Sequence, residues 1–132
     1  MKIISHKLSN YIEKPFFICE GFKKIFQFSI YEDKKKIGKF EISIEQYITL
    51  EDFYIKPDYR NLGYGNIVIQ QINMVLNKMS KDFNITELFL LVHTYDDSFL
   101  DNTALKNFYI KNLNVFDISA DEYEINLFKD FL

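Results

Sequence analysis

Alternating apolar and polar side chains predict two neighbouring strands in the first third of the chain. Phenylalanine and isoleucine occupy every second position over 26–30 and again over 40–44, mostly with polar residues between them. A period of two is typical of a strand with one buried face. The charged segment 32–36 separates the two runs and favours a turn, so we expect an antiparallel hairpin.

A third strand is predicted over 47–56, and its pattern slips in the middle. The apolar positions before Glu51 and those from Phe53 onward keep a period of two but are one residue out of phase. Such a slip predicts a β-bulge at Glu51 and Asp52, a feature that often redirects side chains beside active sites. The alternative is that Phe53 faces a second buried side of a central strand.

The segment 56–65 has the composition of a loop and precedes a helix. Apolar residues recur in that helix with a spacing of three and four and form one stripe, which comprises Val68, Ile72, Val75, Leu76 and Met79. The apolar run 85–92 then predicts a strand that is buried on both faces.

A second helix is predicted after an acidic loop over 95–100. Asp101 or Asn102 caps this helix. Its predicted inner face is formed by Leu105, Phe108, Tyr109 and Asn112. Two alternating strands follow, near 114–119 and 122–128.

The first 24 residues give a weaker pattern. Segment 2–8 has the pattern of a strand, and Ser9 is a candidate cap for a short helix that Pro15 would interrupt. Taken in order, the strands and helices predict one mixed α/β domain over 1–132, built around a single sheet.

Composition and charge narrow the functional classes. The 132 residues include 16 basic and 19 acidic side chains, a net charge of −3, so bulk charge does not favour nucleic-acid binding. The single cysteine, Cys19, excludes an intrachain disulfide and a CxxC metal site; we expect it in the core and predict no metal site. Neither a signal-peptide core nor an apolar run of about 18 residues is present, so we expect no membrane segment and a cytoplasmic location.

A strand, a short loop with Gly63 and Gly65, and a helix start form a candidate anion site. Backbone N–H groups in the first turn of a helix lack intrahelical acceptors, and the helix dipole adds positive potential. The loop is not a phosphate loop, because GxxxxGK[ST] is absent, and it lacks the third glycine of the dinucleotide fingerprint. A plain turn before a helix is the alternative.

The wider motif resembles a known family. Segment 60–65, RNLGYG, resembles the R/Q-x-x-G-x-G/A signature of the GNAT family of N-acetyltransferases, and 53–60 is similar to that family's fourth strand and its extension. Segment 102–109, NTALKNFY, is similar to the later N-x-x-A-x-x-F-Y signature. The resemblance covers about 26–115. It implies an α+β, GNAT-like domain with a mixed, mostly antiparallel sheet, helices packed on it and an abbreviated N-terminal helical region.

Three departures from the family pattern stand out. Leu105 occupies the small-residue position of the later signature, and Ala104 comes one place earlier. A glycine and a phenylalanine that usually follow are replaced by Leu113 and Asn114. The region before the first clear strand is short, which implies an acceptor pocket that is open or built differently.

The resemblance implies acetyl-CoA as the cofactor and CoA as the product. The pyrophosphate would bind the backbone N–H groups of 62–66, and the N–H near Ile55 would polarise the thioester carbonyl. The implied cofactor-binding residues are Tyr54, Ile55, Arg60, Asn61, Leu62, Gly63, Tyr64, Gly65, Asn66, Asn102 and Tyr109. Arg60 is read as a phosphate contact or as a solvated loop residue, and Asn102 as a cofactor contact, a helix cap or both.

Two catalytic residues are implied. Tyr109 matches the family tyrosine that protonates the leaving thiolate, and its alternative is a core aromatic residue. Glu51 lies near the position of the family's basic carboxylate, with Asp52 or a water molecule as replacements and an outward-facing strand residue as the alternative. Burial beside apolar neighbours would raise the pKa of Glu51 toward a useful range.

The expected function is acetyl transfer from acetyl-CoA to a primary amine of a small molecule or peptide. We expect a monomer or homodimer that uses neither nucleic acid nor a membrane as a partner. The alternative is a non-catalytic CoA-binding or protein-interaction module that keeps the fold. A toxin-type acetyltransferase that acts on charged tRNA is a third hypothesis, and the negative net charge opposes it.

Overall fold

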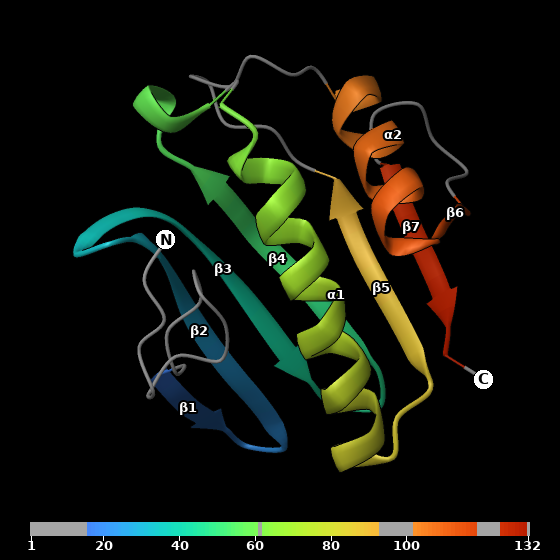
Figure 1. The fold of residues 1–132 in the computed structure, drawn as a ribbon. Coiled ribbons are helices and arrows are strands. Elements are labelled where there is room, and N and C mark those ends of the chain that lie inside the picture. The colour runs from blue at the N-terminus through green and yellow to red at the C-terminus, as the bar shows by residue number, and fades with distance from the viewer. Residues whose placement is uncertain (1–15, 61, 93–101, 119–124, 132) are drawn as a thin grey trace.

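A single seven-stranded sheet organises the part of the chain that the computed structural model describes, residues 16–60, 62–92, 102–118 and 125–131 (Figure 1). The strand order is β1-β2-β3-β4-β5-β7-β6. The elements are β1 (Phe16–Glu20), β2 (Lys23–Glu32), β3 (Lys35–Ile44), β4 (Ile48–Ile55), the 3₁₀ helix η1 (Pro57–Tyr59), α1 (Tyr64–Phe83), β5 (Glu87–Val92), α2 (Asn102–Leu113), β6 (Phe116–Asp117) and β7 (Ile125–Asp130). The expectations for 2–8, Ser9 and 95–100 lie outside the described residues.

The sheet is mixed and mostly antiparallel, as predicted. Strands β1 to β4 form a meander, and β5, β7 and β6 form a second antiparallel block. The one parallel pairing among the described strands joins β4 to β5, because α1 carries the chain back across the sheet between them. The predicted final strands exist, with β6 shorter than expected and β7 shifted toward the C-terminus.

Both α-helices cover the same face of the sheet, which we call the helix face (Figure 1). The predicted stripe of α1 is buried in full. In α2 Leu105 and Tyr109 are buried as expected, whereas Phe108 and Asn112 are half-buried and Leu113 completes the inner face. Between sheet and helices, Phe28 stacks on Phe40 at 4.4 Å between ring centroids, which closes the core under the first hairpin.

The phase slip in β4 is a bulge, as its pattern predicted. Lys39 pairs with Tyr54 and Glu41 pairs with Glu51, so two steps along β3 oppose three along β4. Asp52 takes the extra position with φ of 56°. Gly38 on β3 pairs with Ile55, just after the bulge on β4. A Cβ on Gly38 would overlap the Tyr54 carbonyl oxygen, so only glycine permits this approach of the two strands.

Two burial predictions are wrong. Strand β5 begins at Glu87 and buries Leu88, Leu90 and Val92 on the helix face, but Phe89 on the other face is only half-buried. Cys19 is exposed, because it lies in β1 at the edge of the sheet. Among the described residues no helix is long and apolar enough to cross a membrane.

Candidate active site

The strands β4 and β5 separate halfway along the sheet. Their parallel pairing is limited to three residue pairs and ends with Leu50 opposite Leu90, although β4 continues to Ile55 and β5 to Val92. The two strands diverge toward their carboxyl ends in Figure 1. We call this wedge the β4–β5 opening, and Glu51 lies at its apex as the first residue of β4 beyond the pairing.

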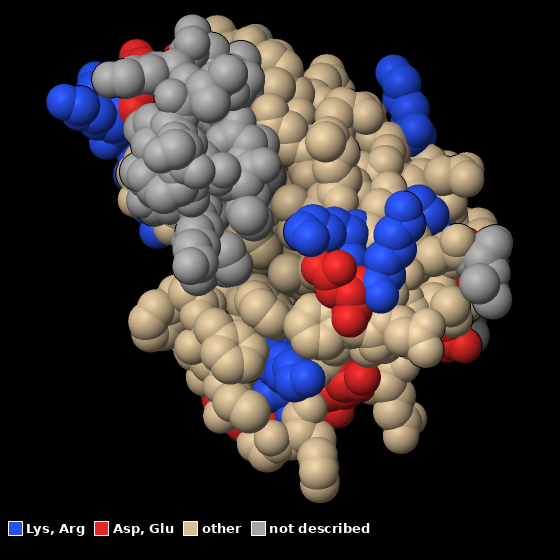
Figure 2. Space-filling model, turned by 60° about the horizontal axis from the view of Figure 1, so that its bottom comes forward, with Lys and Arg blue, Asp and Glu red and all other residues tan. Residues whose placement is uncertain are grey.

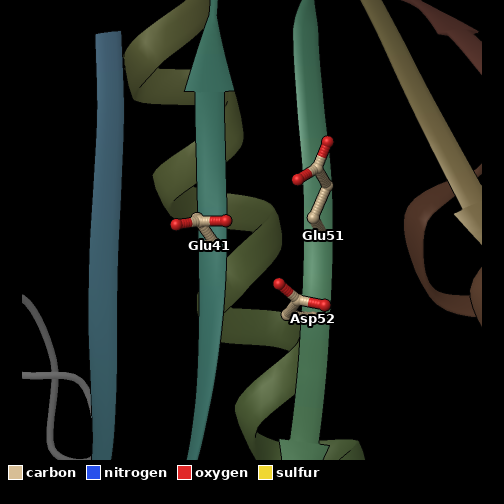
Figure 3. A group of neighbouring side chains, drawn as sticks. All are labelled: Glu41, Glu51 and Asp52. Carbon is tan, nitrogen blue, oxygen red and sulfur yellow. The ribbon is translucent and has the colours of Figure 1, made fainter. Parts of the chain in front are cut away.

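The bulge places two successive acidic residues on the same side of β4. Glu51, Asp52 and the cross-strand neighbour Glu41 project from the face turned away from α1 (Figure 3). One oxygen atom of each carboxylate lies within 4.8 Å of the others. Gln27 Nε2 donates a hydrogen bond of 3.2 Å to Glu41 Oε1. The cluster thus creates a local negative field that attracts a cation, such as an ammonium group, to the apex of the opening.

The environment of Glu51 favours the protonated form of its carboxyl. Burial raises the pKa of its carboxyl above the ordinary value of 4.5, the Lys23 ammonium opposes this rise, and Glu41 and Asp52 add to it. The direction agrees with the expectation from the sequence. Neither Glu41 nor Lys23 was predicted as its neighbour, since their proximity depends on the register of three strands.

The backbone of Ile55 points into the opening. Lys56 N–H donates to the Ile37 carbonyl at 2.7 Å, so the antiparallel ladder turns the N–H and C=O of the preceding residue away from β3. Arg60 Nε donates to the Ile55 carbonyl at 2.6 Å, and its guanidinium lies 5.1 Å from the centre of the Tyr54 ring. The Ile55 N–H therefore points away from β3 toward the opening, and Arg60 makes a contact with the Ile55 carbonyl that the sequence did not indicate.

The glycine loop meets α1 at the same end of the opening. Gly63 is the N-cap with φ of 85°, a left-handed conformation that glycine adopts without strain. Leu62 and Asn66 are exposed, and Tyr64 and Gly65 are half-buried in the first helical turn. Among the residues that the structure describes, a Cβ on Gly65 would meet only the Phe108 ring, at 3.9 Å, so these residues leave room for a ligand beside Gly65. Asn61 lies outside the described residues.

Tyr109 lies across the sheet from the carboxylates. It belongs to α2 and is 5% exposed, and its ring packs edge-on against Phe53 with 6.4 Å between centroids. Phe53 follows the bulge on β4 and packs against the core under the helices. Because Tyr109 packs on Phe53, it lines the helix-face side of the opening. Helix α2 begins at Asn102, which is its first helical residue, and Asp101, the other candidate cap, lies outside the described residues.

Charge is mixed over the visible surface. Basic and acidic side chains lie next to one another in Figure 2, and Lys78 and Asp82 form an ion pair of 3.1 Å on α1. The view contains no broad basic field of the kind that nucleic-acid backbones bind.

No protein-family model matches the chain, and no curated protein does either. Solved structures do match. Campylobacter jejuni N-acetyltransferase PseH in complex with acetyl coenzyme A has a TM-score of 0.56 and 18% identity, over 84% of this chain and 70% of that one. A mutant AtaT toxin bound to the C-terminus of the antitoxin AtaR has a TM-score of 0.57 and 17% identity, over 81% and 66%.

A third match has a repeated architecture. The tandem GNAT protein from the clavulanic acid biosynthesis pathway aligns with a TM-score of 0.56 and 9% identity, over 75% of this chain and 30% of its own. Identities this low establish similarity of fold. The described chain therefore has the GNAT N-acetyltransferase fold.

Proposed function

We propose that the protein is an acetyl-CoA-dependent N-acetyltransferase. One observation carries the proposal: the β4–β5 opening has a carboxylate of raised pKa at its apex on one face and a tyrosine on the other. A base and an acid on opposite sides of a gap suit a reaction in which the acceptor enters from one face and the leaving group departs toward the other. The matched fold supports this assignment.

The residues around the opening fit acetyl-CoA. Backbone N–H groups of 62–66 at the start of α1 would hold the pyrophosphate, and the open surroundings of Gly65 leave room for it. The loop that carries them is braced by Arg60, whose positive charge would also attract a phosphate. When bound, acetyl-CoA supplies an acetyl group activated as a thioester.

Each proposed catalytic residue has one task. The Glu51 carboxylate accepts a proton from the acceptor ammonium, because burial makes it a stronger base than an exposed carboxylate. The Ile55 N–H donates to the carbonyl oxygen, where negative charge develops. The Tyr109 hydroxyl donates a proton to the departing sulfur. Asp52 is exposed and is the weaker candidate for the base, directly or through water.

The test combines binding with turnover. Acetyl-CoA at 100 times its dissociation constant should stabilise the fold by about 2.7 kcal/mol, several degrees in melting temperature. A panel of amines with detection of the released thiol should identify an acceptor. Absence of a thermal shift at millimolar acetyl-CoA and with other acyl-CoAs would refute the assignment. Binding without thiol release would favour the non-catalytic CoA-binding or interaction module.

Location and partners follow from the proposal. An acetyl-CoA-dependent enzyme with one unpaired, exposed cysteine suits the reducing cytoplasm. The toxin–antitoxin match concerns that protein, and the net charge of −3, together with the mixed charge on the face drawn in Figure 2, favours a small amine or peptide acceptor over a nucleic acid.

A further inference from the structure

A hollow of about 350 Å³ lies on the face of the sheet opposite the helices, next to the β4–β5 opening. Its chemistry is set by three charged residues, Lys23, Glu45 and Glu51, by the hydroxyl of Ser43 and by the aromatic rings of Tyr47 and Phe89. Its volume is at the small end of the range for small-molecule sites, about 300–1,000 Å³. Glu51 joins this hollow to the apex of the opening, so the hollow is the place for an acceptor under the proposed function.

The register of the sheet forms the hollow. Ser43 pairs with Thr49, and Thr49 pairs with Phe89, so two short side chains on β3 and β4 lie beside a large ring on β5. Tyr47 packs edge-on against Phe89 at 4.8 Å between centroids. The hollow thus has a hydroxyl-bearing floor and an aromatic wall.

The floor contains an unsatisfied polar atom. Ser43 is 3% exposed, and its Oγ has no hydrogen-bond partner among the described residues. A buried hydroxyl without a partner costs about 1–3 kcal/mol, and such a group is usually explained by a ligand or water that it binds. Because Ile42 and Ile44 face the core under the helices, strand alternation turns Ser43 toward the hollow.

Acidic and basic side chains line the hollow together. Glu51, reinforced by Glu41 and Asp52, is anionic where the hollow meets the opening. Lys23 is the one basic residue among the described residues that line the hollow, and its ammonium is close enough to act on the Glu51 carboxyl. Glu45 also lines the hollow, but it is exposed, so solvent screens its charge more than that of half-buried Lys23. The Lys23 ammonium therefore repels a second positive charge on an acceptor and attracts a carboxylate.

We propose that the acceptor is a small zwitterionic amine with an apolar side group, of the α-amino-acid type. Its ammonium binds Glu51, its carboxylate binds the Lys23 ammonium and accepts a hydrogen bond from Ser43 Oγ, and its side group packs on Phe89 and Tyr47. This assignment rests on the proposed function. In the reaction the amine nitrogen forms the C–N bond as the C–S bond breaks. The ammonium loses two protons: the thiolate receives one from Tyr109, which is reprotonated, and solvent takes the other through Glu51.

The test compares acceptors that differ in their charged groups, and it compares wild type with a variant that lacks the Lys23 charge. We expect kcat/KM for phenylalanine to exceed that for 2-phenylethylamine and for 1,4-diaminobutane by at least about tenfold, the equivalent of 1.4 kcal/mol. Lys23→Met should lower the value for phenylalanine by a similar factor, mainly through KM, and should change the value for 2-phenylethylamine less, because that amine has no carboxylate for Lys23 to bind. Ser43→Ala should weaken phenylalanine binding while leaving the fold as stable or more stable. Lys39→Met, an exposed cation on the neighbouring strand β3, is the control and should change neither.

Calorimetry of phenylalanine binding to the CoA-loaded protein separates the two proposals. Binding that Lys23→Met abolishes, without turnover of any amine, would retain the zwitterion site and refute catalysis. Turnover of 2-phenylethylamine or the diamine at rates equal to or above phenylalanine would retain catalysis and refute the zwitterion site. Neither binding nor turnover would refute both.

Discussion

The Arg60 side chain folds back onto the strand that precedes it, and its Nε donates to the Ile55 carbonyl at 2.6 Å. The intervening 3₁₀ helix turns the chain so that this contact spans five residues. The bond fixes the position of the Ile55 carbonyl. Ile55 is also the residue whose N–H, in our proposal, donates to the carbonyl oxygen of the thioester. Arg60 therefore links the geometry of the glycine loop to that of the strand end.

Replacing Arg60 by lysine should separate charge from geometry. Lysine keeps the positive charge but lacks the planar guanidinium that reaches Ile55 and lies over Tyr54. We expect Arg60→Lys to lower the free energy of unfolding by about 1–2 kcal/mol and to reduce kcat more than acetyl-CoA affinity. Denaturant titration and steady-state kinetics measure both effects, with exposed Lys56→Met as the control. Full activity in Arg60→Lys would reduce the role of this residue to its charge.

Glu51→Gln should change the pH dependence of stability. The pKa of Glu51 is raised by burial, so the folded state favours the protonated carboxyl. That stabilisation is fully present below the ordinary value of 4.5 and is lost as pH rises through the raised pKa. At pH values above the raised pKa, Glu51→Gln should therefore have a higher melting temperature than wild type. Below pH 4.5 the two melting temperatures should be equal. A variant that is less stable than wild type at pH 8 would contradict the assigned burial of a charge.

Tyr109→Phe should lower kcat by about 10²–10⁴, the usual range for loss of a general acid. Acetyl-CoA affinity should hardly change, because the hydroxyl acts mainly in the transition state. The ring still packs on Phe53, so stability should fall by no more than about 1–2 kcal/mol. Tyr31→Phe removes another tyrosine hydroxyl, from a half-buried position on β2, and should leave kcat unchanged. Near-normal kcat in Tyr109→Phe would exclude the acid role.

Gly65→Val should weaken acetyl-CoA binding in a folded protein. Of the described side chains, the new Cβ would contact only Phe108, so we expect the fold to tolerate it, while the branched side chain would cover the N–H groups that would meet the pyrophosphate. Isothermal titration with acetyl-CoA measures the loss, and circular dichroism verifies folding. Unchanged affinity would place the pyrophosphate elsewhere.

Gly38→Ala should destabilise the sheet at the bulge. The added methyl group would overlap the Tyr54 carbonyl oxygen, which is backbone and cannot rotate away. We expect a loss of about 1–3 kcal/mol, as for an overpacked buried site, and a lower kcat because β4 shifts beside the opening. Thermal unfolding and kinetics of the same preparation test this, with Gly21→Ala at the β1–β2 turn as a strained but open comparison. Equal losses at both positions would mean that the close strand approach has no special role.

Local patterns in the sequence predicted those features that depend on neighbouring residues. The out-of-phase apolar positions identified the bulge, and the spacing of three and four identified the buried stripe of α1. Features that depend on register were not predictable in this way. Lys23 and Ser43 lie far from Glu51 in the sequence, and only the pairing of β2, β3 and β4 brings them to one hollow. Cys19 was misplaced because a short apolar run does not reveal that its strand is at an edge.

We expect the parallel pairing between β4 and β5, which is limited to three residue pairs, to let the two antiparallel blocks of the sheet open separately. The meander β1–β4 pairs strands that are adjacent in sequence, which favours rapid formation, whereas β5, β7 and β6 must wait for longer loops to close. Amide protons in the two blocks should exchange with solvent through separate opening events in the free protein. A ligand held across the β4–β5 pairing would join them into one cooperative unit, so protection would rise in strands that the ligand never touches.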